Sequence, residues 1–330
     1  MFKNKVFFTI SFLATTMALT ACQPKQAEPK DQQTAQSEPA KQVETVKLVG
    51  DTEKLALGLP ACDGNSCPEI SIERLSSNQA FVDELIDEQI LKQLDQILDI
   101  SPKLLKDKPQ AITTEVTASN SQNQIPDQPA SIAVETNKQK IEKQIAPYLS
   151  TFLLLDKELK ALSANHQISL MIKPKILNAT VPLATVVLNS SSYLGGAHGS
   201  SSQHYYNFDL KNKKQMKLDD ILAPNQKAIL QNKAHEVFKI WVMDSKLADN
   251  LEEYEQVWKF TLSDNFYLST QGLVLQYGEY EIGPYVVGLP RLTIPYDQLQ
   301  TVLKKEYLPP VQTKNSSPAS NPAENNKAKS

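Results

Sequence analysis

The sequence predicts an α+β fold in which antiparallel sheets are covered by helices, arranged as two successive helix-on-sheet subdomains. Three observations lead to this prediction. Apolar residues recur at helical spacing in three separate stretches. Short alternating or β-rich runs lie between and after these stretches. Strands and helices do not alternate at the regular spacing of βαβ units, which favours antiparallel pairing over a parallel sheet.

The N-terminus has the layout of a secretory signal over residues 1–21. Lys3 and Lys5 precede a mostly apolar run that is short for a membrane span. The sequence Leu-Thr-Ala-Cys that ends at Cys22 matches the lipobox of bacterial lipoproteins, in which the cysteine receives lipid and becomes the mature N-terminus. We therefore expect Cys22 to anchor the protein to a membrane. The alternative is an ordinary signal peptide followed by a chance cysteine.

The segments at the two ends of the chain are predicted to be disordered. Residues 22–47 are a tether rich in Gln, Lys, Glu, Pro and Ala, and residues 309–330 form a similar tail. The folded part then divides into an N-terminal companion domain, 48–185, and a C-terminal domain, 186–308. Gln23 rather than Asp follows the lipobox cysteine, so lipoprotein sorting favours the periplasmic face of the outer membrane if the host has two membranes.

The charge of the chain argues against a nucleic-acid partner. The formal net charge is -3, and removal of Lys3 and Lys5 with the signal leaves it near -5. No basic cluster resembles a nucleic-acid footprint. A mildly acidic protein suits a cationic partner.

Cys62 and Cys67 flank a stretch with the composition of a turn. In an oxidising envelope this pair is expected to form a disulfide. The small loop limits its stabilisation to roughly 2 kcal/mol. Zinc binding is the alternative, but a lone pair of cysteines lacks the other two ligands of a structural zinc site.

The first half of the folded part alternates strands with two long helices. Asn78 is placed to cap the first helix, and Pro147 should kink the second helix or mark its real beginning. The expected strands are 69–75, 111–118, 167–177 and 181–190, and the expected helices are 81–98 and 141–162.

A glycine-rich bend at residues 193–199 joins the strand that ends at residue 190 to a strand over 204–210. Gly195 and Gly196 let the backbone turn sharply without a Cβ clash, and we expect at least one of them to take a positive φ. The same reasoning places His198 at or near the tip of the bend.

The second half is predicted to contain one long helix and several short strands. A polar hairpin turn at 211–214 precedes it, and Asp219 and Asp220 start a helical turn. The acidic run near 251–254 is a solvated loop or helix. The expected strands are 216–218, 266–269, 273–277 and 291–294, and the expected helices are 229–241 and 298–303.

Side chains that could support catalysis or metal binding form no recognised motif. His198 and His204 flank the bend and could meet as metal ligands, but no metal-ligand pattern surrounds them. Ser200 lacks the frame of a nucleophile elbow, and the Asp219–Asp220 pair more often starts a helix than transfers protons. We therefore expect no metal, no cofactor and no catalysis. A peptidoglycan-processing enzyme remains an alternative.

Tyrosines gather around the bend and around residues 280–285, where a rigid ring with a polar tip suits a recognition surface. The alternative is that half of them are core strand residues. The tyrosines concerned are Tyr193, Tyr205, Tyr206, Tyr277, Tyr280 and Tyr285.

Five motifs carry a resemblance to the RsiV-like extracytoplasmic domain. They are Tyr193-x-Gly-Gly-Ala-His198, Asn207-Phe208-Asp209-Leu210, Leu218-Asp219-Asp220-Ile221-Leu222, Tyr280-Glu281-Ile282-x-Pro284-Tyr285-x-x-Gly288 and Ile294-Pro295-Tyr296. The part before residue 186, with Pro68-x-Ile70-Ser71, is similar to the companion domain that also precedes the catalytic domain of PdaC-type peptidoglycan deacetylases.

The resemblance implies an α+β fold, an envelope location and a binding role. The best understood type in the family is an anti-sigma factor that binds lysozyme through this domain. This chain lacks a sigma-binding segment, a transmembrane helix and a deacetylase domain, so the resemblance implies a non-catalytic lipoprotein that binds a lysozyme-like muramidase or peptidoglycan. A purely structural envelope protein is the alternative. The implied binding residues are Tyr193, His198, Tyr205, Tyr280, Pro284 and Tyr285.

Overall fold

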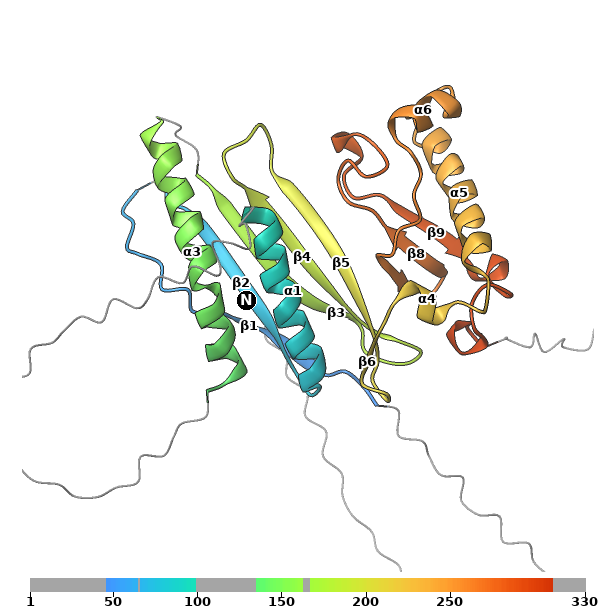
Figure 1. Cartoon of the computed structure of the whole chain (residues 1–330), viewed down its shortest axis with the longest axis horizontal. Helices are drawn as coiled ribbons and strands as arrows, with labels where there is room; N and C mark the ends of the chain where they lie inside the picture. Colours follow the sequence, from blue (N-terminus) through green and yellow to red (C-terminus); the bar gives the residue numbers. More distant parts are fainter. Residues whose placement is uncertain (1–45, 65, 99–134, 163–166, 311–330) are drawn as a thin grey trace, which may run out of the picture. The chain divides into compact units, whose positions relative to one another are not determined.

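The computed structural model of the protein describes residues 46–64, 66–98, 135–162 and 167–310 (Figure 1). The predicted signal, Cys22, nearly all of the tether and tail, and the predicted strand at 111–118 lie outside the described residues. Within the described part, no helix combines the length and the apolar character needed to cross a membrane.

The described part has a mixed α+β fold with antiparallel sheets and helices, as the sequence predicts. Its larger sheet has six strands in the order β1-β2-β3-β4-β5-β6. Neighbouring strands are antiparallel except β2 and β3, which are parallel because helices α1 and α3 lie between them in the chain. The strands are β1 Gly50–Lys54, β2 Glu69–Ser77, β3 Ser169–Asn178, β4 Ala184–Tyr193, β5 Ser200–Asp209 and β6 Lys214–Met216.

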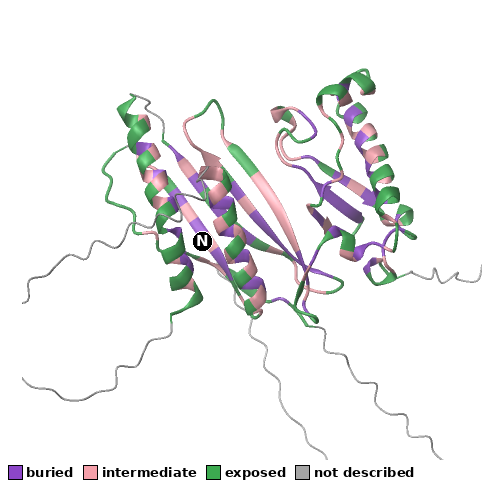
Figure 2. Cartoon of the chain, viewed as in Figure 1, coloured by how far each residue is buried: buried purple, intermediate pink, exposed green. Residues whose placement is uncertain are grey.

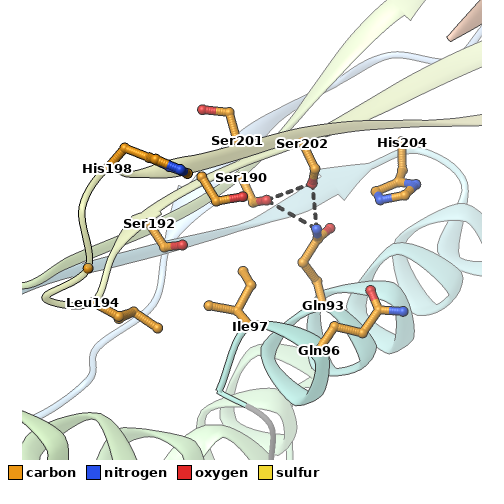
Figure 3. Close-up of a pocket in the computed structure, with 12 residues that line it drawn as sticks. Gln93, Gln96, Ile97, Ser190, Ser192, Leu194, His198, Ser201, Ser202 and His204 are labelled. Atoms are coloured by element: carbon orange, nitrogen blue, oxygen red, sulfur yellow. Dashed lines mark hydrogen bonds between the residues drawn. The ribbon is translucent and has the colours of Figure 1, made fainter. Parts of the chain in front are cut away.

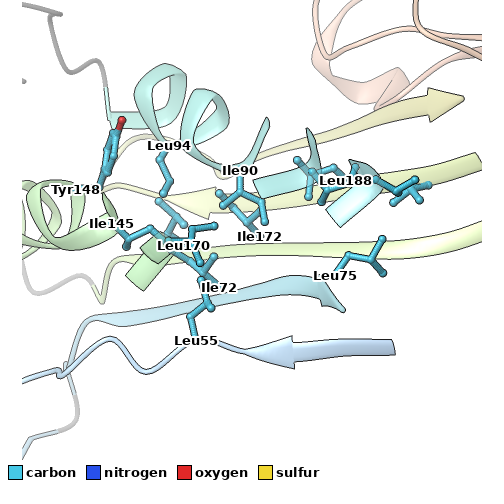
Figure 4. Packing of buried hydrophobic residues seen from close by; sticks show 14 of the residues in the cluster. Leu55, Ile72, Leu75, Ile90, Leu94, Ile145, Tyr148, Leu170, Ile172 and Leu188 are labelled. Atoms are coloured by element: carbon cyan, nitrogen blue, oxygen red, sulfur yellow. The ribbon is translucent and has the colours of Figure 1, made fainter. Parts of the chain in front are cut away.

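Helices α1 (Ala80–Leu98) and α3 (Asn137–Ala161) bury their apolar sides against this sheet (Figures 1 and 4). The side chains of α1 that recur every four residues, from Val82 to Leu94, are fully buried. On the sheet, Ile72 and Ile172 face them and are also fully buried. Figure 2 shows the same alternation of buried and exposed positions along the elements. The helical spacing read from the sequence is therefore core packing.

The starts of these two helices differ from the sequence prediction. The side chain of Asn78 does not cap α1; it pairs with the backbone of Lys47 and Val49 ahead of β1. Helix α3 begins well before Pro147, because Thr136 and Gln139 form a capping box. The helix continues through Pro147, so this proline does not mark its beginning.

The remaining elements build a second hydrophobic cluster around a three-stranded sheet in the order β7-β8-β9. Helix α5 packs on it, and every residue of the central strand β8 is buried. The predicted helix at 298–303 is instead a 3-10 turn, Tyr296–Gln298, followed by turns. The other bounds are α4 Leu218–Ile221, α5 Lys227–Asp244, α6 Leu251–Val257, β7 Phe266–Leu268, β8 Gly272–Gln276 and β9 Arg291–Pro295.

The boundary predicted between residues 185 and 186 lies inside β4. Both β4 and β5 belong to the six-stranded sheet, and their inward residues pack with α1 and α3. The packing instead changes near β6, where Met216 joins the second cluster. Cys62 and Cys67 lie at disulfide distance before β2, with Cα atoms 5.9 Å apart.

Candidate functional site

Strands β4 and β5 form a long antiparallel hairpin, and the glycine-rich bend closes it. Their register runs from Ala184 opposite Phe208 to Ser192 opposite Ser200. At the bend Gly195 takes a φ of +87°, whereas Gly196 does not have a positive φ. The expectation that at least one glycine has a positive φ is confirmed, and the constrained residue is Gly195.

The two faces of β5 contact different partners, because side chains alternate along a strand. On the face toward α1, Tyr206 donates a hydrogen bond to Gln89 at 3.3 Å. On the opposite face, the ring of Tyr205 stacks on Tyr267 with centroids 4.4 Å apart. On that face the side chain of Asn207 also donates to the carbonyl of Phe266 at 2.8 Å.

Two polar side chains from later in the chain, Asn265 and Glu279, cover the open edge of β5. The amide of Asn265 accepts from the backbone N–H of Tyr205 at 2.8 Å and donates to the carbonyl of Gln203 at 2.7 Å. Nearer the bend, the carboxylate of Glu279 accepts from the N–H of Ser201 and the hydroxyl of Ser200, both at 2.9 Å. These contacts replace the hydrogen bonds that a further strand would make.

At the tip of the hairpin, four aromatic rings stack one after another. His198 stacks on Tyr285 with centroids 3.9 Å apart, and its Nε2 lies 3.0 Å from the hydroxyl of Tyr280. The rings of Tyr280 and Tyr285 are 5.7 Å apart, and Trp258 stacks on Tyr280 at 6.5 Å. The hydroxyl of Tyr285 also donates to the carbonyl of Gly199 at 2.9 Å. The bend and the 279–285 loop are thus held together.

This stack borders an exposed surface with apolar and acidic character. Tyr280 is 50% exposed and Val286 is 85% exposed. Glu279 is half-buried and bonded to β5, whereas Glu281 is exposed and accepts from the N–H of Gly278 at 2.7 Å. We call the set His198, Trp258, Tyr280, Tyr285 and Val286 the aromatic surface.

The structure brings together only part of the predicted binding set. His198, Tyr280 and Tyr285 meet directly, and Pro284 precedes Tyr285 at the start of a short 3-10 turn. Tyr193 is half-buried at the end of β4. Tyr205 packs against Tyr267, and burial raises the pKa of its phenol, so it has a packing role.

Sequence reasoning missed Trp258, Val286, Asn265 and Glu279 as parts of this region. The sequence did carry a signal for Val286, because an apolar residue between Pro284 and Gly288 lies in a loop whose tyrosines already indicated a binding surface. The contacts of the other three residues join positions far apart in the sequence, so no local pattern predicts them.

A polar cavity of about 530 Å³ lies beside the bend, between α1 and the hairpin (Figure 3). Gln93 of α1 donates to the hydroxyls of Ser190 and Ser202, at 3.1 and 2.6 Å, and these two hydroxyls lie 2.8 Å apart. His204 lines the same cavity. Burial, together with the nearby charge of Lys92, lowers the pKa of its imidazole.

The residues considered for catalysis have other partners. The hydroxyl of Ser200 donates to Glu279, while Asp219 and Asp220 pair with Lys227 and Lys214. Ser200 lines the same cavity as His198, but its hydroxyl is bonded to Glu279, and neither Asp219 nor Asp220 lines that cavity. In the part of the chain that the structure describes, no three His, Cys, Asp or Glu side chains are grouped so as to hold a metal ion.

Comparison with known proteins assigns the C-terminal part to a domain family. Residues 219–297 match the family described as a protein of unknown function (DUF3298), so the chain contains a DUF3298 domain. This range includes Tyr280 and Tyr285 but not the hairpin that carries His198. No curated protein matches the chain.

Solved structures of the same family resemble this chain. A DUF3298 family protein from Pseudomonas aeruginosa PAO1 is 22% identical, covers 79% of this chain and 95% of its own, and has a TM-score of 0.52. A DUF3298 family member from Bacteroides fragilis is 18% identical over 80% of this chain and 96% of its own, with a TM-score of 0.47. The likeness to the first protein shows a shared fold.

Proposed function

We propose that this protein is a non-catalytic lipoprotein of the cell envelope that binds a lysozyme-like muramidase through the aromatic surface. Peptidoglycan itself is the second candidate ligand. The observation that carries the proposal is the stack of His198, Tyr280 and Tyr285, with the exposed residue Val286 directly after Tyr285 in the same 3-10 turn. The resemblance to the RsiV-like domain supports the same location, because it places a partner at the Pro284-Tyr285 segment.

The aromatic surface is organised before any partner arrives. Its rings are fixed by stacking, by the Tyr280–His198 contact and by the hydrogen bond from Tyr285 to Gly199. Binding through fixed side chains loses little conformational entropy, so more of the contact energy appears as affinity. Amphipathic aromatic residues of this kind dominate the energetics of many interfaces.

The charge of the protein favours a cationic partner. The chain has a formal net charge of -3, and the exposed residue Glu281 directly follows Tyr280. Lysozymes are commonly cationic, so the association should weaken as salt rises. A neutral glycan would show little of this salt dependence, and the two candidate ligands are thereby distinguishable.

The test is a calorimetric titration of the full-length chain, in detergent, with hen egg-white lysozyme at 50 and 500 mM NaCl. We expect binding at low salt and at least tenfold weaker binding for Val286→Asp, because burying a carboxylate in an apolar contact costs more in lost hydration than its attraction to a cationic partner returns. Val49→Asp is the matched control, because Val49 is 58% exposed and precedes β1 at the other edge of the six-stranded sheet. Co-sedimentation with peptidoglycan sacculi tests the second ligand. The proposal fails if wild type binds neither.

Lipid anchoring is a separate part of the proposal, and it rests on the lipobox sequence that ends at Cys22. We expect metabolic labelling with a palmitate analogue to mark the wild-type protein and not Cys22→Ala. Label that persists in the variant would contradict the assignment.

Two alternatives are separated from this proposal by specific results. A peptidoglycan-processing enzyme would release products from sacculi, and it would need groups that have other partners here: Ser200 is bound to Glu279, and Asp219 to Lys227. A purely structural envelope protein would bind neither lysozyme nor sacculi and would crosslink in cells only to neighbouring lipoproteins.

A further inference from the structure

We propose that the polar cavity between α1 and the β4–β5 hairpin binds an uncharged saccharide. The cavity of about 530 Å³ falls within the size range of pockets that hold small molecules, roughly 300–1,000 Å³. Its lining combines hydroxyl and amide groups with two aliphatic side chains, Ile97 and Leu194. A sugar ring presents the complementary chemistry, with hydroxyls around its rim and C–H groups on its faces.

The hydrogen bonds among the side chains of the cavity leave one hydroxyl proton free to bind a ligand. Gln93 spends both amide protons on Ser190 and Ser202, and these two hydroxyls share one hydrogen bond. Whichever serine donates to the other, one hydroxyl proton of the trio is left over, because each hydroxyl carries a single proton. Gln93 is only 6% exposed. The three side chains Gln93, Ser190 and Ser202 therefore form a fixed donor site rather than a mobile surface group.

The lining carries no strong charge. Its twelve residues include no Lys, Arg, Asp or Glu, and the lowered pKa of His204 keeps that imidazole neutral at pH 7. A neutral imidazole offers one donor and one acceptor, as a sugar hydroxyl also requires. Lys92, whose charge acts on His204, does not line the cavity, so an anionic ligand such as a phosphate would give up its water without a cationic side chain in contact with it. These features select an uncharged, hydroxyl-rich ligand.

This site is distinct from the aromatic surface, although His198 touches both. Val286, the residue substituted to test lysozyme binding, does not line the cavity. Saccharide binding can therefore be lost while lysozyme binding is retained, and the reverse is also possible.

The test uses saturation-transfer NMR on the full-length chain in detergent, with diacetylchitobiose and maltose as neutral probes and glucose 6-phosphate as the anionic comparison. We expect transfer to at least one neutral disaccharide and a weaker signal for the phosphate. Ser192→Phe fills the cavity and should weaken binding at least tenfold. Ser191→Phe is the matched control, because the neighbouring side chain points to the opposite face of β4.

Ser202→Ala provides a second variant that removes one hydroxyl of the trio without adding bulk. We expect it to weaken saccharide binding by the folded protein severalfold and to lower the melting temperature slightly, because the buried amide of Gln93 loses one acceptor. This variant decides the matter if Ser192→Phe does not fold. Val286→Asp should bind saccharide as wild type does. The proposal is overturned if neither neutral probe binds wild type, if the cavity variants bind as wild type does, or if the phosphate binds best.

Discussion

Gly195 takes a φ of +87° in the bend, a conformation that residues with a Cβ rarely adopt. A Cβ built there would lie 2.8 Å from Cδ1 of Leu159, at the end of a flexible side chain that can shift. The backbone conformation is therefore the main cost of substitution. We predict that Gly195→Ala lowers the free energy of unfolding by about 1–3 kcal/mol, measured by urea denaturation.

Gly196→Ala is the matched control for this prediction. Gly196 does not take a positive φ, and a Cβ there would meet only the carbonyl of His198, at an ordinary 3.8 Å. Its effect on stability should stay within about 0.5 kcal/mol, as for most surface substitutions. Equal losses for the two variants would contradict the assignment of the turn conformation to Gly195.

Strand β5 depends on a side chain from elsewhere in the fold. Asn265 makes two hydrogen bonds to the β5 backbone, at Gln203 and Tyr205. We predict that Asn265→Leu destabilises the protein by about 1–3 kcal/mol, because a backbone donor and acceptor lose their partner. Urea denaturation measures this loss. The adjacent exposed residue supplies the control Asp264→Ala, which should be nearly neutral, and a neutral Asn265→Leu would refute the role given to this contact.

The sequence was sufficient to predict most elements and insufficient to predict their ends. Helix α1 follows from four apolar residues at regular spacing, because one side of a helix must be buried. The role of Asn78 does not follow, since its partners Lys47 and Val49 lie about thirty residues earlier. Pairing at that separation leaves no local pattern. The boundary predicted at 185/186 falls inside β4, which pairs with β3 as well as with β5.

At the scale of the whole molecule, contacts across long sequence separations bring the candidate sites together. Sequence reasoning singled out His198, Tyr280 and Tyr285 separately, from residue type and from resemblance. The stacking of His198 on Tyr285 joins the hairpin to a loop more than eighty residues later. The polar cavity likewise combines α1 with β4 and β5, so its serines alone did not reveal it.

In the proposed function, the bend and the 279–286 loop form one recognition surface. Hydrogen–deuterium exchange of the full-length chain, with and without hen egg-white lysozyme at 50 mM NaCl, tests it most directly. We predict slower exchange in residues 194–199 and 278–288 together on binding, with the β1 edge unchanged. Slowing in only one of the two segments, slowing confined to other parts of the fold, or no change at saturating lysozyme would contradict the account.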